Sequence, residues 1–181
     1  KYKVNNFQET EKVIEKQRMI KDEEEIEKIT KACEITDQCF THLLSFIKIG
    51  QTEKEIALEI ERYFKMHGAE DVSFETIVAS GKNSSKPHAI PTDKKIELGD
   101  VITIDFGCKY EGYCSDMTRT IFAGYIPEDV KPIYDLVLKN QTQTQEEYKE
   151  GANVKILARM VENDFKLNGY DLIHSLGHGV G

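Results

Sequence analysis

Apolar and polar residues alternate along positions 101–122, a pattern typical of β-strands that bury one face. Most of these residues are β-branched or aromatic, and Gly112 can adopt the positive φ angle that a tight turn requires. The pattern therefore predicts a hairpin whose turn occupies residues 109–112. With the turn centred on that range, Asp105 lies directly opposite Asp116.

Because successive side chains of a strand point to opposite sides, the hairpin has one apolar face and one polar face. The apolar face is expected to pack on helices and carries Ile102, Ile104, Phe106, Met117 and Ile121, with Ser115 and Arg119. The polar face surrounds the two carboxylates and carries Val101, Thr103, Asp105, Gly107, Cys114, Asp116, Thr118 and Thr120. A register shift of one residue would place the two Asp on opposite faces.

The Asp pair is the first candidate for chemistry. Two ionised carboxylates about 5 Å apart on a sheet repel each other and are costly to bury, and a cation between them would remove both costs. An exposed hairpin face with two solvated Asp side chains is the alternative interpretation. Cys114 shares this face and could be a further ligand, although a packing role is the simpler interpretation.

The N-terminal part of the chain shows helical periodicity. Asp22 and Glu25 form a capping-box signature, which predicts a helix that ends near Gly50. The expected apolar stripe of this helix is Ile26, Ile29, Cys33, Ile35, Phe40, Leu43, Leu44 and Ile47. The charged residues before it, up to Lys21, form either a linker or a short helix.

A second capping signature, Thr52 with Glu55, predicts the next helix. That helix is expected to end at residues 67–68 and to bury Ile56, Ile60, Tyr63 and Phe64. His42 and His67 lie on these two helices and are interpreted as ordinary surface or core histidines.

A strand is expected at residues 74–79, followed by a loop over residues 80–91 that is dense in turn-forming residues. Within this loop, His88 lies between Pro87 and Pro91, which restrict the backbone. A loop histidine is exposed by default. Its rigid position just before the Asp hairpin makes His88 a candidate site residue.

Two further helices are expected over residues 127–149 and 153–167, with Pro132 tolerated only in the first turn of the former. The alternating glycines near the end of the chain argue against a helix and suit a strand or loop that other backbone or a ligand approaches closely. On a strand, His174 and His178 would point the same way and could converge on one site.

Composition limits the possible functions. The chain has 181 residues, enough for one domain with a real core. Its formal net charge of −8 argues against nucleic acid as a partner, and no apolar run reaches membrane-spanning length. The four cysteines include no C-x-x-C pair, so reduced thiols in a cytoplasmic protein are the simplest interpretation. Helices combined with an antiparallel sheet predict an α+β fold.

Four segments, in this order, resemble the pita-bread metallopeptidases, which include methionine aminopeptidase, aminopeptidase P and prolidase. They are Pro87-His88, residues 99–107, residues 112–120 and residues 174–181. The Asp-Met-Thr-Arg-Thr run and the two late histidines are most similar to the Xaa-Pro branch. The resemblance implies a pita-bread fold, with an antiparallel sheet that has helices on one side, and hydrolysis of the N-terminal Xaa-Pro bond.

By this resemblance, Asp105, Asp116 and His178 are metal ligands, while His88 and His174 contact the substrate or the developing oxyanion. Two divalent ions are the implied cofactors, and the oxygen-rich ligands favour Mn²⁺ over Co²⁺ or Zn²⁺. The implied partner is a peptide with proline in the second position, and a homodimer is an expected form of the full-length protein. Nucleic acid and membrane are not expected partners.

The resemblance also leads us to expect an incomplete copy of the catalytic domain. The family has two glutamate ligands after the histidine motif, and this chain contains neither. Residues 1–21, which begin without Met, are expected to be a linker from a missing N-terminal domain, and residues 22–181 a partial catalytic domain with an incomplete second half. We therefore expect the chain by itself to be inactive.

Two other functions stay open on the same fold. One is a metal-free binding module, which the two Asp and His178 disfavour and the missing glutamates leave open. The other is a creatinase-like amidinohydrolase, which does not use the metal pair and which the intact Asp pair disfavours. The chain shows no competing nucleophile such as a G-x-S-x-G turn.

Overall fold

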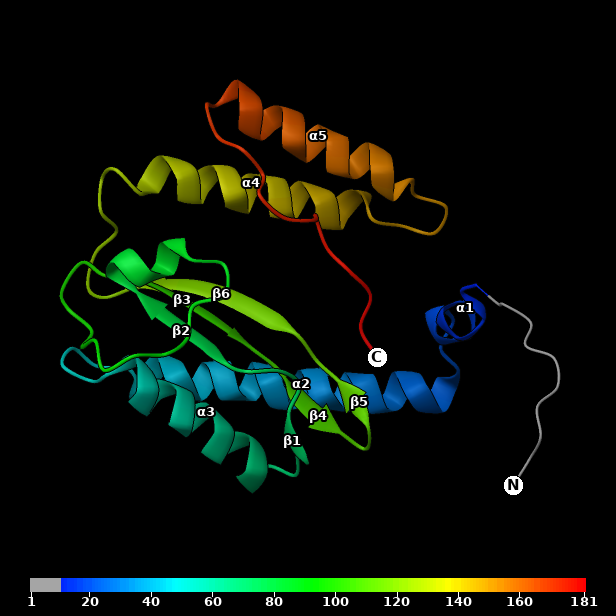
Figure 1. The fold of residues 1–181 in the computed structure, drawn as a ribbon, viewed down its shortest axis with the longest axis horizontal. Helices are drawn as coiled ribbons and strands as arrows, with labels where there is room; N and C mark the ends of the chain where they lie inside the picture. Colours follow the sequence, from blue (N-terminus) through cyan, green and yellow to red (C-terminus); the bar gives the residue numbers. More distant parts are fainter. Residues whose placement is uncertain (1–10) are drawn as a thin grey trace, which may run out of the picture.

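The computed structural model describes residues 11–181, so residues 1–10 of the predicted linker lie outside the described part. The described residues before Asp22 include a short helix, α1 (Val13–Met19). The other elements are α2 (Glu23–Phe46), α3 (Glu53–Met66), β1 (Asp71–Val72), β2 (Ile77–Ser80), the 3-10 helix η1 (Gly81–Ser85), β3 (Val101–Phe106), β4 (Cys108–Tyr110), β5 (Tyr113–Cys114), β6 (Met117–Phe122), α4 (Lys131–Glu147) and α5 (Val154–Leu167) (Figure 1). Every strand pair is antiparallel, which confirms the predicted α+β class.

Both capping signatures begin helices, as predicted. Asp22 accepts a hydrogen bond from the Glu25 backbone N–H at 2.9 Å, and the Glu25 carboxylate accepts one from the Asp22 N–H at 2.8 Å. Thr52 and Glu55 form the same reciprocal pair at the start of α3. These bonds satisfy backbone donors that have no partner within the first helical turn.

The hairpin forms, but its register differs from the prediction by two residues. Asp105 pairs with Thr118, because the loop consists of Glu111 and Gly112 alone. Both loop residues have positive φ angles, 46° and 85°, as the two-residue turn that matches strand twist requires. Since the shift is an even number of residues, every side chain keeps its predicted face. Asp105 and Asp116 therefore share a face as diagonal rather than directly opposite neighbours.

The hairpin is divided between two small sheets, of strand order β2-β3-β6 and β1-β4-β5. The division falls at Gly107, where a Cβ atom would lie only 2.0 Å from the carbonyl oxygen of Ser115. Only glycine allows this close approach of the two backbones. The strand predicted over residues 74–79 is shorter than expected at its start, because residues 74–76 are irregular and β2 begins only at Ile77.

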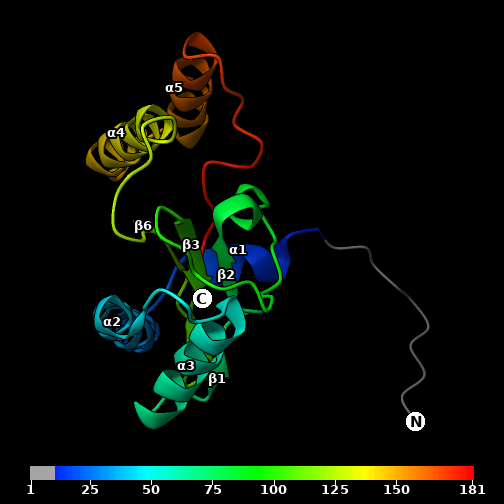
Figure 2. The ribbon, with the colours of Figure 1, turned by 90° about the vertical axis from the view of Figure 1, so that its left-hand side faces the viewer.

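The main core lies between the apolar hairpin face and the helices α2 and α3, which cover that face (Figures 1 and 2). It contains the predicted hairpin residues Ile102, Ile104, Phe106 and Met117 and the α3 residues Ile56, Ile60 and Phe64. The predicted α2 stripe was partly wrong. Its buried apolar residues are Ala32, Ile35, Cys39 and Leu43, whereas Ile26, Cys33 and Leu44 are exposed. Small residues face inward because β4 lies close: the Cys108 Sγ is 3.3 Å from the Ala32 carbonyl oxygen.

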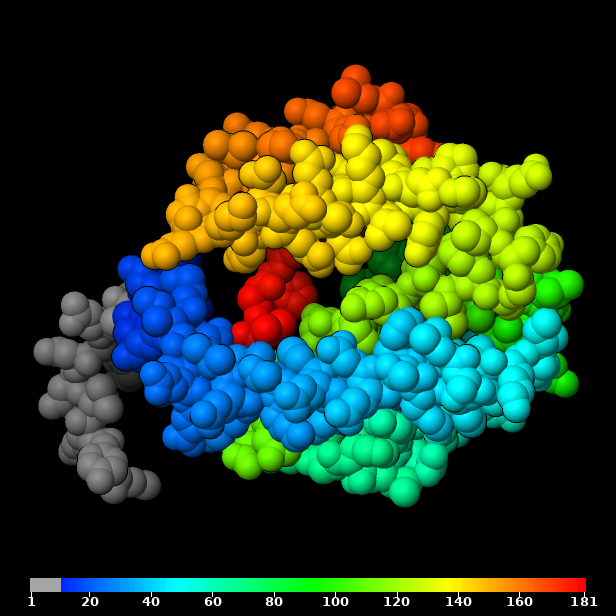
Figure 3. Space-filling view, turned by 180° about the vertical axis from the view of Figure 1, so that it is seen from behind, coloured from blue at the N-terminus to red at the C-terminus, as the bar shows by residue number. Residues whose placement is uncertain are grey.

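The helices α4 and α5 lie side by side on the other side of the sheet from α2 and α3 (Figures 1 and 2). They have a separate small core of Leu136, Val161 and Phe165. Pro132 lies in the first turn of α4, as predicted, although the helix begins at Lys131 rather than near residue 127. The C-terminal residues leave α5 and are visible between α2 and α4 (Figure 3). No helix within residues 11–181 combines the length and apolarity needed to cross a bilayer.

Candidate metal and substrate site

The polar hairpin face holds the two candidate carboxylates. The Thr118 hydroxyl donates a hydrogen bond of 2.8 Å to Asp105 Oδ1 and fixes the orientation of that side chain. Burial raises the pKa of Asp105; the Thr118 bond opposes this rise, and the negative charge of Asp116 adds to it. The two carboxylates are thus close enough to repel each other, as the shared face predicts.

His178 reaches this face from the far end of the chain. Its Nε2 lies 3.3 Å from Asp116 Oδ2, and its Nδ1 lies 3.0 Å from the Gly179 carbonyl oxygen. An Nδ1–H that donates to this carbonyl leaves Nε2 with a lone pair directed at the carboxylate. Such a contact is stabilised only if a proton or a cation is shared between the two groups, and metal-bound histidines commonly donate their other N–H to a carbonyl.

His88 lies in the loop between β2 and β3 and is exposed, as predicted. The next residue, Ala89, is buried against Ile77 and Ala79. Ile77 pairs with Asp105, so this small apolar cluster belongs to the same sheet face as the carboxylates. The charge of His88 lowers the pKa of Asp105, as does that of His178. Packing of Ala89 therefore holds His88 beside the carboxylates.

His174 does not join the group. Residues 174–181 are irregular rather than a strand, and the His174 Nδ1 contacts the Ser175 carbonyl oxygen at 2.7 Å. Within residues 11–181, no hydrogen bond or ion pair links His174 to the carboxylates. The expected convergence of the two late histidines was argued from the fixed side-chain direction of a strand, which this segment does not have, and it stays a prediction.

The donor set fits a divalent cation in its chemistry. Two carboxylates and an imidazole are common ligands of Mn²⁺, Co²⁺ and Zn²⁺, and the Asp116–His178 contact is one that a cation would stabilise. Nevertheless, no three His, Cys, Asp or Glu side chains among the described residues are arranged closely enough to hold an ion. The candidate ligands Asp105, Asp116 and His178 therefore do not form a complete cation site among the described residues.

The remaining histidines lie outside this site, whereas Cys114 keeps its expected place on the hairpin face of the carboxylates. His42 contacts the Glu59 carboxylate at 2.7 Å, and the His67 ring stacks on Tyr63. All four cysteines are free thiols, in agreement with the predicted opposite directions of Cys108 and Cys114.

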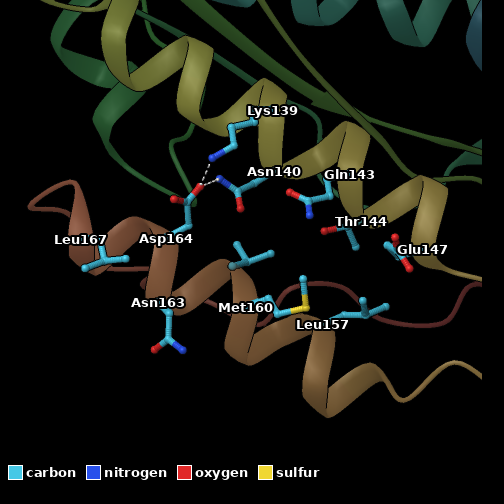
Figure 4. A pocket seen from close by; sticks show the side chains of 11 residues that line it. Lys139, Asn140, Gln143, Thr144, Glu147, Leu157, Met160, Asn163, Asp164 and Leu167 are labelled. Atoms are coloured by element: carbon cyan, nitrogen blue, oxygen red, sulfur yellow. Dashed lines mark hydrogen bonds and ion pairs between the residues drawn. The ribbon is translucent and has the colours of Figure 1, made fainter.

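A hollow of about 340 Å³ lies between α4 and α5 but contains none of the predicted site residues (Figure 4). Two carboxylates line it, Asp164 and Glu147, and Asp164 is already paired. It accepts bonds from Lys139 Nζ at 2.9 Å and from Asn140 Nδ2 at 2.8 Å. Its charge is paired in this way within the hollow.

Sequence reasoning missed one residue beside the site, Glu53. Its side chain is fully buried and accepts hydrogen bonds from both ends of the His88 loop. The sequence did show an acid at this position, directly after the cap residue Thr52. An acid in the first turn of a helix is normally explained by the helix dipole alone, so its burial was not expected.

The sequence matches a model of metallopeptidase family M24 over residues 27–181. It is 44% identical to the Xaa-Pro dipeptidase of Pyrococcus furiosus, covering 100% of this chain and 53% of that protein. The structure is similar to that of the Xaa-Pro dipeptidase from Bacillus anthracis, with a TM-score of 0.91, 40% identity, and coverage of 95% of this chain and 49% of that chain. It is also similar to the X-Pro aminopeptidase from Thermotoga maritima, with a TM-score of 0.88, 44% identity, and coverage of 93% and 48%. The chain spans about half the length of the curated relatives it matches.

Proposed function

This chain belongs to metallopeptidase family M24, and we propose that the full-length protein hydrolyses the bond between an N-terminal residue and a proline in second position. The observation that carries the proposal is the sheet face on which Asp105 and Asp116 lie together and His178 contacts Asp116 at 3.3 Å. Relatives that bear the name Xaa-Pro dipeptidase support the choice of substrate. The pita-bread fold predicted from the sequence is shared with these relatives.

We assign the metal-ligand role to Asp105, Asp116 and His178. The preferred ion is Mn²⁺, ahead of Co²⁺ and Zn²⁺. Divalent ions at this site would supply an activated water molecule and polarise the scissile carbonyl group. Thr118 holds Asp105 in place through its hydroxyl group. The Nδ1 contact of His178 with Gly179 supports the tautomer whose Nε2 is free to bind an ion.

We assign His88 and His174 to the substrate. His88 is exposed at the edge of the carboxylate face, where its ring N–H can donate to the oxygen that becomes negative during hydrolysis. His174 is exposed as well, and its Nδ1 contact with the Ser175 carbonyl oxygen supports the tautomer whose Nε2 is free to meet the substrate.

The substrate assignment is tested with the full-length protein, Mn²⁺, and a matched pair of peptides. We expect release of the N-terminal residue from Xaa-Pro peptides and no release of Met from Met-Ala peptides. The opposite preference would move the protein to a methionine aminopeptidase function. Absence of bound metal in the purified full-length protein, by elemental analysis, would instead favour the metal-free binding module or the creatinase-like activity.

Replacing His88 or His174 by Ala in the full-length protein should lower kcat by about 10²- to 10³-fold, as the loss of an oxyanion donor does. Metal content should stay near normal, because neither residue is an ion ligand. Elemental analysis and steady-state kinetics measure the two effects. His67→Ala is a suitable control, since that ring stacks on Tyr63 away from the site. Loss of bound metal from either site variant would show that a ligand has been assigned to the substrate by mistake.

We also propose a cytoplasmic location. The free thiols of Cys33, Cys39, Cys108 and Cys114 support it, since reducing compartments keep cysteines unpaired. Homodimer formation by the full-length protein stays a prediction from the family resemblance.

A further inference from the structure

The Glu53 side chain is a buried carboxylate for which the proposed mechanism has no use. It belongs to the first residue of α3 and is 0% exposed. No Lys, Arg or His side chain among the described residues pairs with it, so hydrogen bonds alone stabilise its charge. Burial by itself would raise the pKa of Glu53, but the hydrogen bonds from Thr92 and Ser80 outweigh burial and lower it. Glu53 is therefore an ionised acceptor within the fold.

The donors to Glu53 all come from the loop that carries His88. Ser80, the last residue of β2, donates its backbone N–H at 2.7 Å and its hydroxyl at 2.8 Å to Oε1. Thr92 donates its N–H at 2.9 Å and its hydroxyl at 2.7 Å to Oε2. The Asn83 amide lies 3.2 Å from both oxygens. One carboxylate therefore closes the loop at its two ends and holds its first turn.

The rest of the loop is held to the carboxylate face. Ala89 packs on Ile77 and Ala79, and Ile77 is the strand partner of Asp105. His88 precedes Ala89, so its position depends on two attachments, the apolar contact of Ala89 and the base that Glu53 closes. The Lys54 backbone N–H also donates to the Thr92 carbonyl oxygen at 3.2 Å, which ties the same base to α3.

We propose that Glu53 is a positioning residue, which acts on the reaction by fixing the His88 loop against the Asp105 face. The proposal rests on the function proposed above for His88. A hydrogen-bonded carboxylate suits this purpose because its two oxygens accept several bonds in fixed directions, whereas an apolar contact at the loop base would leave the loop free to slide.

Glu53→Gln in the full-length protein is the test. The amide keeps the shape but turns one oxygen into an NH₂ donor, which must then face the donors of either Ser80 or Thr92. We expect amide hydrogen exchange of residues 81–91 to accelerate by at least about tenfold, kcat to fall by about 10- to 100-fold, and KM and metal content to change little.

Glu59→Gln is the matched control. Glu59 lies on the same helix, is 8% exposed, and bonds Arg62 and His42 rather than the loop. If Glu53 had only a structural role, both variants would lower thermal stability by a similar amount, and they would have equal effects on the loop exchange and on kcat. Equal effects of the two variants on exchange and kcat would overturn the proposal.

A double-mutant cycle with His88→Ala tests whether Glu53 acts through His88. We expect Glu53→Gln to lower kcat by less than about threefold in the His88→Ala background, because the ring it positions is already absent. Full additivity of the two effects would overturn the proposal.

Failure of the proposed function gives a different result. If the full-length protein cleaves no Xaa-Pro peptide, the position of the His88 loop can still be measured by the NMR chemical shift of the His88 ring and by amide exchange of the loop. A His88 ring signal that is unchanged in Glu53→Gln would then overturn the positioning role. If Glu53→Gln does not fold, Asn83→Ala removes the two longer bonds to Glu53, with the Asn83 contacts to Lys86 and to the Thr92 hydroxyl, and leaves the bonds of Ser80 and Thr92 to Glu53 in place. It should accelerate loop exchange by a smaller factor, and exchange identical to that of the unmodified protein overturns the proposal.

Discussion

Asp116→Asn in the full-length protein should reduce both bound metal and Xaa-Pro hydrolysis by more than about a hundredfold. Loss of a residue that only hydrogen-bonds a metal ligand typically lowers metal affinity or activity by about 10- to 100-fold. Loss of the ligand's own charge should lower both by more than that. The amide keeps the size of the side chain but cannot offset a divalent charge. It also turns the contact with His178 Nε2, now 3.3 Å, into one between neutral groups.

The fold should survive this substitution. The Asp116 side chain is 28% exposed, and the residues on either side, Ser115 and Met117, supply the buried contacts of this part of the hairpin. Elemental analysis, turnover and thermal unfolding measure the three expectations. Asp93→Asn is the matched control, because within residues 11–181 that surface carboxylate pairs with Lys54 alone, at 2.9 Å. Undiminished metal content and turnover in Asp116→Asn would refute the ligand role.

Residues 1–181 alone should show no Xaa-Pro hydrolysis above about one hundredth of the full-length rate, and weak Mn²⁺ binding. Two ions close together repel each other and need bridging carboxylates, which the family resemblance places outside this chain. The three candidate ligands present are not arranged to hold an ion within the described residues. His178, which does not belong to the hairpin, is 72% exposed and lies in an irregular segment. Binding of an ion must therefore order that segment, and the conformational entropy lost lowers the affinity.

The comparison requires the two proteins side by side, with calorimetric titration of Mn²⁺ and the same Xaa-Pro peptide. Full-length Asp116→Asn is the reference, because it gives the rate of hydrolysis that remains when one proposed metal ligand is lost. Comparable turnover from residues 1–181 and from the full-length protein would mean that three ligands suffice, and the two-ion proposal would then be wrong.

Local sequence determined where the helices begin and which way the hairpin side chains point. A capping box needs only residues three apart, so Asp22 with Glu25 and Thr52 with Glu55 could be recognised directly. Strand alternation has a period of two, so Asp105 and Asp116 were assigned to one face even though the register was two residues away from the observed one. The motifs around these residues were also sufficient to identify the metallopeptidase family from the sequence.

Tertiary structure decided the features that depend on distant contacts. The two-residue turn requires a positive φ angle at Glu111, which no local preference of glutamate demands. The close approach of β4 placed the small residue Ala32 of α2 in the core, while the larger Ile26 and Leu44, which match the helical period as well, are exposed. Burial of Glu53 and the contact between His178 and Asp116 join parts of the chain that only packing brings together. Sequence periodicity describes each element about its own axis, whereas these contacts depend on how separate elements are placed against one another.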